Sequence, residues 1–432
     1  MIRSHLVLAL CFLPCSTLTG QGGQQQTLRA ILDKAEAAAS LTTGDTPFHA
    51  EMKISGVKKE PQYEASITLD WASRTKYRVE VRSHNFHQVK IVDDGKVDEQ
   101  NEGDFYPGWL HSFVTALLDP LSIKPLFLDP QAAIQGSRSS TNGKTTLCIN
   151  RNNNPGGVRD DMTWSGFCVT EDGKLTNAYN FVTWMDFSDH AGFGGKKVAR
   201  SYSTSTGNYE QIVGKLTSLR KVQPTESGAI QVTQAASDSK RINFAFISTK
   251  AEEARLESAK PFDWPQIREG KTEGYMIVHA LTDVTGQVRE TSKYNSDNPG
   301  LEEAGREAAL GYKFKPMLVD GVPVQMEMPL VLHFKTSPGV PLPFLKGDEI
   351  TQVSKTCKNP VILPKGIGEL GKHYHVKVSV NETGKRTGET FPDGYPDFGF
   401  VMKTVESCNF GVYTVDGKPS YYHVEVEFVA PQ

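Results

Sequence analysis

The sequence of 432 residues lacks the compositional biases that identify several classes of protein. Its formal net charge is -3, and charges of neither sign form a long block. The composition therefore indicates neither a nucleic-acid partner nor an anionic membrane surface. Beyond residue 20, no apolar run approaches the roughly 20 residues that a transmembrane helix needs. With 38% hydrophobic and 22% charged residues, the chain is typical of globular proteins, and its length favours about three domains.

Motifs for catalysis and metal binding are also absent from the sequence. Residues 143–145 (Gly-Lys-Thr) resemble the end of a phosphate-binding loop, but Arg138 stands where that motif needs a glycine. There is no Gly-x-Ser-x-Gly, His-Glu-x-x-His or Cys-x-x-Cys. His373 and His375 can share one face of a strand, but no third ligand is evident. We expect a protein that is not an enzyme and holds neither a metal nor a cofactor.

The first twenty residues have the layout of a secretory signal peptide. Arg3 precedes an apolar stretch over residues 6–13, and small and polar residues fill positions 16–20. We expect cleavage after Gly20 and export to the periplasm or cell envelope. Two alternatives stay open, namely lipidation at Cys15 and retention of the segment as an anchor.

Cysteine is scarce, with six in the chain, and four would remain after removal of the signal peptide. An even number of cysteines in an exported chain favours disulfides, for which four cysteines allow three connectivities. Pairing Cys148 with Cys168 and Cys357 with Cys408 keeps each bridge inside one predicted domain, and we favour that pairing. Four buried thiols are the alternative.

The N-terminal half shows helical periodicity followed by strand periodicity. Apolar residues predict a helix over 27–40 and a second one over 107–118, which Asp119 and Pro120 end. The strands alternate apolar and polar residues, which predicts an antiparallel sheet with one apolar face. The predicted strands include residues 48–54, 63–71, 77–81, 89–91, 167–169, 178–184 and 212–219.

Residues 27–222 resemble the outer-membrane lipoprotein carrier family of LolA type. The resemblance rests on the leading helix, the run over 63–71, Lys76-Tyr77-Arg78 and the run over 89–95. It implies a curved half-barrel around an apolar cavity that accepts acyl chains.

Three residues are candidates for that cavity. The resemblance places Arg78 at the cavity mouth, and Trp109 and Phe113 on the inserted helix could line the cavity. The alternative for Arg78 is a solvated strand position, because Tyr77 and Val79 point to the opposite face. The alternative for the two aromatic residues is ordinary core packing.

The C-terminal part contains a tandem repeat. Residues 278–286 match residues 376–384, and residues 314–323 match residues 410–419, so the offset changes from 98 to 96 residues. The Thr-Gly and Val-Asp-Gly elements predict hairpin turns. Residues 299–309 have helical spacing between them. Each unit therefore predicts two strands, one helix and two more strands.

Residues 261–335 are similar to a TonB C-terminal domain. The similarity rests on a spaced set of motif residues, with a degenerate second copy over 357–431 in which Cys408 stands at the position of Tyr312. The motif residues are Gly274, Gly286, Leu301, Ala308, Tyr312, Phe314, Pro316, Gly321 and Pro323.

We therefore expect an α+β chain: an N-terminal curved antiparallel sheet (half-barrel) with helices, then two small domains in which a helix packs on an antiparallel sheet. The expected segments are a signal peptide over 1–20, the half-barrel over 21–225, a linker with a short helix over 226–260, a TonB-C-like domain over 261–337, a Pro-rich linker over 338–355 and a second TonB-C-like domain over 356–432.

The TonB resemblance implies binding by an exposed sheet edge that pairs with an extended peptide. Our first hypothesis is a non-enzymatic binding or adaptor protein of the bacterial cell envelope whose partner is an envelope protein. The alternative is a periplasmic carrier of lipid or lipoprotein acyl chains. Energy transduction is disfavoured, because no long Pro-rich spacer is present and a large β-domain precedes the repeats. Nucleic acid is not expected as a partner.

Overall fold

The computed structural model describes residues 21–44, 46–58, 60–128, 133–141, 144–152, 165–179, 184–205, 211–222, 242–247, 255–267, 269–339, 341–365, 367–390 and 398–431. The predicted signal peptide and Cys15 lie outside these ranges. The chain divides into two compact units, of which the first comprises Met1–Asp263, Tyr275–Ser296 and Glu302–His333, and the second Trp264–Gly274, Asp297–Leu301 and Phe334–Gln432. Among the described residues, no helix has both the length and the apolar character needed to cross a bilayer.

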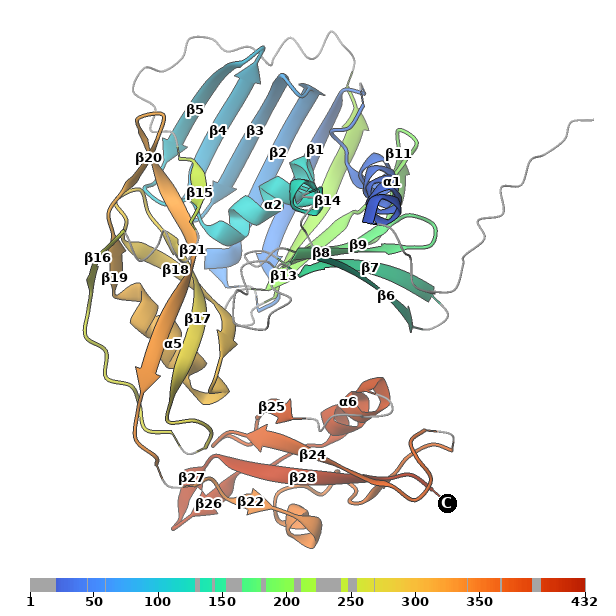
Figure 1. The fold of residues 1–432 in the computed structure, drawn as a ribbon, viewed down its shortest axis with the longest axis vertical. Helices are drawn as coiled ribbons and strands as arrows, with labels where there is room; N and C mark the ends of the chain where they lie inside the picture. Colours follow the sequence, from blue (N-terminus) through green and yellow to red (C-terminus); the bar gives the residue numbers. More distant parts are fainter. Residues whose placement is uncertain are drawn as a thin grey trace, which may run out of the picture. The chain divides into compact units, whose positions relative to one another are not determined.

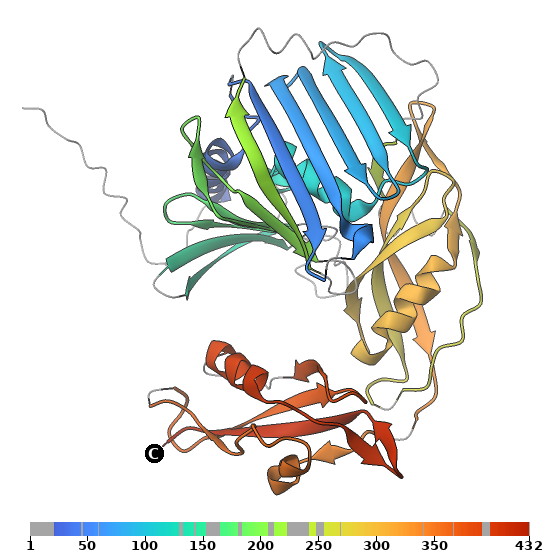
Figure 2. The ribbon, with the colours of Figure 1, turned by 180° about the vertical axis from the view of Figure 1, so that it is seen from behind.

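The alternating segments of the N-terminal half form one twelve-stranded antiparallel sheet, as expected. The sheet is bent, and β6–β9 turn away from the plane of β1–β5 (Figures 1 and 2). Its strands are, in spatial order, β5 (Lys96–Glu102), β4 (His87–Asp93), β3 (Lys76–Ser83), β2 (Ala65–Ser73), β1 (Phe48–Gly56), β14 (Gln211–Lys221), β13 (Ser201–Ser205), β10 (Trp184–Ser188), β9 (Leu175–Tyr179), β8 (Ser165–Thr170), β7 (Lys144–Asn152) and β6 (Ala133–Thr141). A separate hairpin joins β11 (Ala191–Phe193) and β12 (Lys196–Val198).

Three helices accompany this sheet: α1 (Gln21–Ala39), α2 (Gly108–Leu118) and α3 (Lys124–Phe127). The predicted helix over 107–118 is confirmed by α2, which lies against one face of the sheet (Figure 1). Leu110, Phe113 and Leu117 recur at helical spacing and are buried in the core of the sheet. A Cβ atom at Gly214 would lie 2.7 Å from the Phe113 ring, so the glycine makes room for this ring.

The first repeat, called module 1 (residues 242–339), contains the predicted two strands and helix, but three strands follow the helix where two were expected, and two short strands precede them. Its long strands lie in the order β21-β17-β18, with β15 beyond β21. The elements are β15 (Phe244–Phe246), β16 (Leu256–Ala259), β17 (Glu273–Thr282), β18 (Val288–Ser296), α5 (Glu302–Leu310), β19 (Tyr312–Phe314), β20 (Met317–Val319) and β21 (Val322–Lys335).

The second repeat, called module 2 (residues 341–431), has the same topology, with its long strands in the order β28-β24-β25. In both modules the hairpin turns at residues 320–321 and 416–417 consist of Asp-Gly with positive φ, as a type I′ turn requires. The elements are β22 (Phe344–Leu345), β23 (Val361–Ile362), β24 (His373–Val380), β25 (Arg386–Thr390), α6 (Phe398–Ser407), β26 (Tyr413–Val415), β27 (Lys418–Ser420) and β28 (Tyr422–Val429).

The two modules also close their first hairpin in the same way. The side-chain oxygen of Asp283 accepts hydrogen bonds from the backbone N–H groups two and four residues further on, and Asn381 accepts the equivalent pair in module 2. Gly286 and Gly384 follow with φ angles of 89° and 79°. The sequence repeat therefore corresponds to a structural repeat down to single hydrogen bonds.

Both predicted linkers contribute strands to the modules, which corrects the expected boundaries. Residues 256–259, expected in the linker with a short helix, form β16 and pair with β19. The preceding residues 248–254 lie outside the described part. The predicted Pro-rich linker contains β22 and the short 3₁₀ helix Gly347–Gln352. Pairing with a neighbouring strand satisfies backbone groups that a solvated linker would leave to water.

Both predicted disulfides are present, so the alternative of four thiols is wrong. Cys148 and Cys168 face each other directly on β7 and β8. Cys357 and Cys408 join in module 2, and the corresponding positions of module 1 are Ala259 and Tyr312, which face each other across β16 and β19. The bridge therefore occupies the place of a strand pair.

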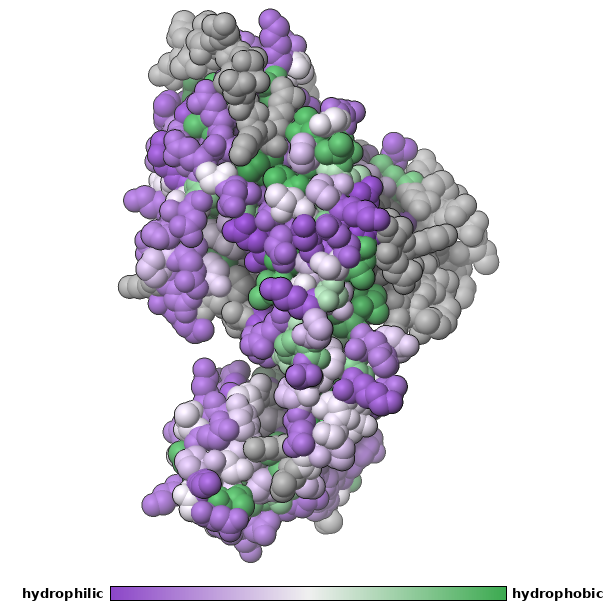
Figure 3. Space-filling view, turned by 90° about the vertical axis from the view of Figure 1, so that its left-hand side faces the viewer, coloured by the Kyte–Doolittle hydropathy of each residue, from purple (hydrophilic) through white to green (hydrophobic). Residues whose placement is uncertain are grey.

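The surface is mixed in character. On the side shown in Figure 3, hydrophobic residues occur in small groups among hydrophilic ones. The large apolar side chains that are exposed belong to several different elements, among them Phe246 of β15, Leu256 of β16, Leu318 of β20 and Val331 of β21.

Candidate ligand-binding cavity

The sheet edge expected to bind a partner is partly covered in module 1. The short strand β15 runs parallel to β21 and pairs with its residues 325–327. The backbone N–H of Gln325 donates to the Asn243 carbonyl, and that of Ile247 donates to the Glu327 carbonyl. β20 pairs with residues 322–324 at the start of β21. The connector that precedes the module thus occupies part of the edge.

In module 2 the corresponding edge is covered at both ends. β22 pairs in parallel with β28 at residues 423–424, and β23 does so at residues 428–429. Between them, the backbone N–H of Glu427 donates to the Asn359 side chain over 2.8 Å. The expectation of a free edge on both modules is therefore wrong for β28 and for the start of β21. Covered edges are the usual protection against unwanted strand pairing.

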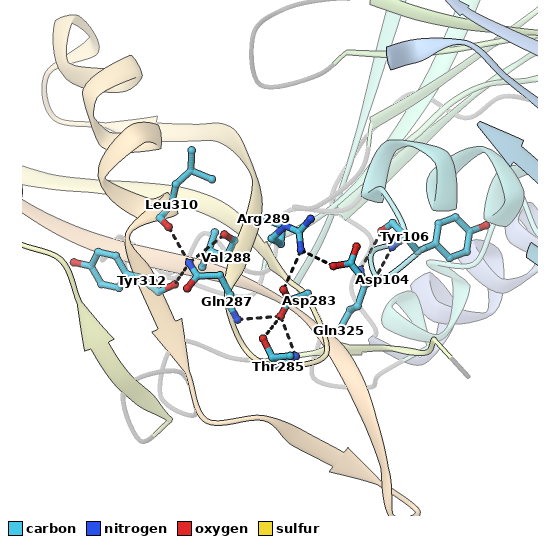
Figure 4. A network of polar contacts seen from close by, with 10 residues as sticks. All are labelled: Asp104, Tyr106, Asp283, Thr285, Gln287, Val288, Arg289, Leu310, Tyr312 and Gln325. Carbon is cyan, nitrogen blue, oxygen red and sulfur yellow. Dashed lines mark hydrogen bonds and ion pairs between the residues drawn. The ribbon is translucent and has the colours of Figure 1, made fainter. Parts of the chain in front are cut away.

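Module 1 is bound to the N-terminal sheet domain by one buried and one exposed set of polar contacts (Figure 4). Gln325 is fully buried, and its side chain accepts the Tyr106 N–H over 2.8 Å and donates to the Tyr106 carbonyl over 3.0 Å. Arg289 lies 3.2 Å from both Asp104 and Asp283. Most of the first module, expected as a separate domain, thus belongs to the same compact unit as the half-barrel.

A carboxylate of module 1 also completes helix α2. Pro107 stands at the N-cap of α2 and offers no side-chain hydrogen bond. Instead, Glu290 of β18 accepts the Gly108 N–H over 2.9 Å. A carboxylate at this end is stabilised by the helix dipole and by the free N–H groups. Burial raises the pKa of Glu290, and its hydrogen bond to Gly108 opposes that rise.

A cavity of about 470 Å³ lies between strands β3 and β4, helix α2, strand β15 and the β20–β21 hairpin. This volume is within the range of ligand pockets in proteins, roughly 300–1,000 Å³. One wall is apolar, and one end is polar. Its lining residues are Tyr77, Val79, Gln88, Lys90, Tyr106, His111, Val114, Thr115, Leu118, Ile242, Asn243, Phe244, Val319 and Val324.

The polar end contains a charge pair in which the glutamate is buried and the lysine is half-buried. The Lys90 ammonium lies 3.6 Å from Glu99, which faces it across β4 and β5 and is 1% exposed. The Oε1 atom of Glu99 accepts hydrogen bonds from the side chains of Gln88 (3.1 Å) and Asn101 (3.0 Å). It also accepts the backbone N–H of Ile242 over 2.9 Å. Buried carboxylates need such partners to remain ionised at low cost.

His111 separates the cavity from a smaller one of about 110 Å³ that also touches Thr115 and Asp119. The His111 ring stacks on Phe244, with 3.9 Å between the ring centroids. Burial lowers the pKa of His111. The imidazole is therefore neutral at neutral pH. For Asp119, burial raises the pKa, and the hydrogen bond from the Leu121 backbone opposes this.

None of the three residues predicted for an acyl cavity lines either of these cavities. Arg78 lies on the other face of β3, where it bonds to Glu80. Trp109 packs edge-on against Tyr63 at a centroid distance of 5.9 Å, and Phe113 is fully buried in the core. The period of two in β3 puts Arg78 opposite to the lining residues. On α2, helical spacing puts Phe113 on the stripe that faces the sheet.

The motif residues of the TonB resemblance serve the fold of module 1 and not the cavity. Leu301, Ala308 and Phe314 are buried in its core, while Gly286 and Gly321 form its turns. His373 and His375 each pair with a glutamate of β28, Glu427 and Glu425 respectively. The described residues contain no cluster of three or more potential metal ligands.

Sequence reasoning missed the polar end of the cavity. On β4 the alternation suggested an inner face with Val89 and Ile91, but Gln88 and Val92 are the buried residues, and Lys90 shares their face. The spacing of His111, Val114, Thr115 and Leu118 on α2 is the signal that could have found the opposite wall.

No family model matches the chain, and no curated protein matches it. Among solved structures, a DUF1329 family protein from Desulfovibrio piger is 12% identical, with a TM-score of 0.32 over 49% of this chain and 100% of that chain. A LolA superfamily protein from Nitrosomonas europaea is 8% identical, with a TM-score of 0.29 over 46% of this chain and 95% of that chain. LprF from Mycobacterium bovis is 11% identical, with a TM-score of 0.13 over 46% and 93%. None of these matches supports the TonB resemblance.

Proposed function

We propose that the chain binds the acyl chain of an amphiphile in the cavity beside α2, and that it acts as a carrier of lipids or of lipoprotein acyl chains in the bacterial cell envelope. The observation that supports this most is a cavity of about 470 Å³ with one apolar wall and one polar end. The envelope location rests on the signal-like pattern of the first twenty residues.

The energetics of an acyl ligand fit this cavity. Each buried methylene contributes about 0.8 kcal/mol, so ten of them contribute about 8 kcal/mol. Association costs about 4 kcal/mol or more in lost freedom of motion, and the polar end adds hydrogen bonds to a head group. Burial of ten methylenes alone therefore leaves about 4 kcal/mol, a Kd of about 1 mM, and each head-group hydrogen bond adds about 1 kcal/mol to the affinity.

The adaptor hypothesis is less well supported. It requires an exposed sheet edge, and on the side of the last strand the chain itself pairs with residues 325–327 of β21 and with both ends of β28. An incoming peptide would have to displace β15, β22 or β23 before it could pair there.

Native mass spectrometry of the exported, purified full chain tests the carrier function. We expect extra mass corresponding to bound acyl lipid. Thr115→Phe, which places a ring in the cavity wall, should abolish the extra mass. Thr217→Phe on the exposed side of β14 is the matched control and should retain it. Protein without bound lipid, or retention of lipid by Thr115→Phe, would contradict the proposal.

A further inference from the structure

We infer that the cavity selects amphiphiles whose head group has no net charge, such as a neutral ester or amide, over free carboxylates and phosphates. This inference rests on the proposed function, because it names the class of ligand that the same cavity takes.

The first argument is the charge of the lining. Among the described residues that line the cavity, Lys90 carries the one permanent charge. Its ammonium lies 3.6 Å from the Glu99 carboxylate, so the two charges sum to zero. His111, the other titratable base in the lining, is neutral because burial lowers its pKa. A charged head group would therefore find no unpaired opposite charge in the cavity to neutralise it.

The second argument is that Glu99 is held in place. Its side chain is 1% exposed, and one of its oxygens accepts three hydrogen bonds from Gln88, Asn101 and the Ile242 backbone. An anionic head group beside Lys90 would compete with a carboxylate that cannot withdraw. Burial of the resulting excess negative charge is costly.

The third argument is the set of hydrogen-bonding groups that a neutral head could use. Tyr77 and Asn243 belong to the lining of the cavity, as Lys90 does. Burial raises the pKa of Tyr77, so its hydroxyl stays protonated and can donate a hydrogen bond. A carbonyl oxygen of an ester or amide accepts such bonds without bringing a charge.

Binding of probes that share one acyl chain tests the inference. We would titrate the full chain at pH 8 with monopalmitoylglycerol, palmitate and palmitoyl lysophosphatidylglycerol. The expected result is that monopalmitoylglycerol binds at least about tenfold more tightly than either anion, as for a buried charge without a partner.

Two substitutions change the charge of the cavity in opposite directions. Glu99→Gln keeps an acceptor oxygen but leaves Lys90 unpaired. The affinity for palmitate should therefore rise about tenfold relative to the affinity for monopalmitoylglycerol. Lys90→Gln should lower the affinity for palmitate further, and it should change the affinity for monopalmitoylglycerol by less than about threefold. Glu80→Gln, a glutamate on the other face of the sheet, is the matched control and should leave the ranking unchanged.

The outcomes separate the two proposals. If none of the probes binds the native chain, the proposed function itself fails. If palmitate binds as tightly as monopalmitoylglycerol, or if Glu99→Gln and Lys90→Gln leave the ranking unchanged, the selection of neutral heads is overturned while acyl binding stands. Thermal unfolding of each variant shows whether it is folded, and Lys90→Gln carries the test if Glu99→Gln does not fold.

Discussion

Modules 1 and 2 share a topology, yet they differ at the face of the sheet that lies opposite the helix of the module. On β17 of module 1, Ile277, His279 and Leu281 are buried, and Leu281 lies near the start of α2. At the corresponding register of β24, module 2 carries exposed His375 and half-buried Lys377. One repeat has thus become a wall of the N-terminal domain, while the other has kept a polar face.

The position of Glu290 shows the same difference at a single site. In module 1, Leu281 pairs with Glu290, and this glutamate caps α2. In module 2 the same register pairs Ser379 with Gly388, which has no side chain to offer. The comparison indicates that attachment to the N-terminal domain depends on a few side chains and not on the backbone fold of the module.

The largest effect is expected from the disulfide that replaces a strand pair. Removing it by Cys357→Ala and Cys408→Ala should destabilise the chain by about 4 kcal/mol, because the bridge closes a sequence separation of 51 residues. Hydrogen exchange should accelerate in β24 and β28 and stay unchanged in β17 and β21. Equal acceleration in both modules would show that the bridge does not act locally. The matched control, Cys148→Ala with Cys168→Ala, should spare both modules.

The next effect is expected at the shared hairpin glycines. A Cβ atom at Gly286 would lie 1.8 Å from the Phe314 carbonyl oxygen, whereas one at Gly384 would lie 2.8 Å from the Phe410 carbonyl oxygen. Gly286→Ala should cost about 3 kcal/mol and Gly384→Ala about 1–2 kcal/mol, both measured by urea unfolding. A larger loss at Gly384 would contradict the closer packing that we describe for module 1.

A smaller effect is expected from the pH dependence of Glu290. Burial raises its pKa in the folded state above the ordinary value of 4.5, so the folded chain binds this proton more tightly than the unfolded chain does. Its contribution to stability is therefore greatest at low pH and is lost as the pH rises through the folded pKa. Glu290→Gln, which keeps an acceptor for Gly108, should flatten this slope and raise the free energy of unfolding at pH 8 relative to that at pH 4. An unchanged slope in urea unfolding from pH 4 to pH 8 would exclude Glu290 as its source.

The smallest effect is expected at Tyr106, whose backbone bonds to Gln325 where the N-terminal sheet domain meets module 1. Its hydroxyl is buried and has no hydrogen-bond partner among the described residues. Tyr106→Phe should leave stability unchanged or raise it by up to about 1 kcal/mol, because no bond is lost. A loss of more than about 1 kcal/mol in thermal or urea unfolding would reveal a partner for this hydroxyl.

Features set by local sequence could be predicted, and features set by distant contacts could not. The Asp-Gly turns, the helix over 107–118 and both cysteine pairs follow from short-range patterns and from parity. The docking of Gln325 on Tyr106 joins residues 219 positions apart, and neither residue type signals it. The short strands β22 and β23 have two residues each, too few for a period to be visible.

The sequence predicted an apolar cavity, but it did not predict where the cavity lies or which residues line it. An apolar cavity was expected inside the half-barrel, yet the observed cavity uses Val319 and Val324 of module 1 as one wall. A wall contributed by another predicted domain cannot be inferred from the periodicity of either segment. The polar end was hidden because Gln88 and Lys90 stand on the inner face of β4, where the alternation suggested apolar residues.

Photo-crosslinking with a palmitoyl amphiphile that carries a diazirine at the end of its chain tests the central claim most directly. Peptide mapping of the full chain should find the label on α2 between residues 108 and 118 and on the β20–β21 hairpin between residues 317 and 324, with module 2 unlabelled. Label on module 2, or label on neither α2 nor the hairpin, would contradict the assignment of the acyl site.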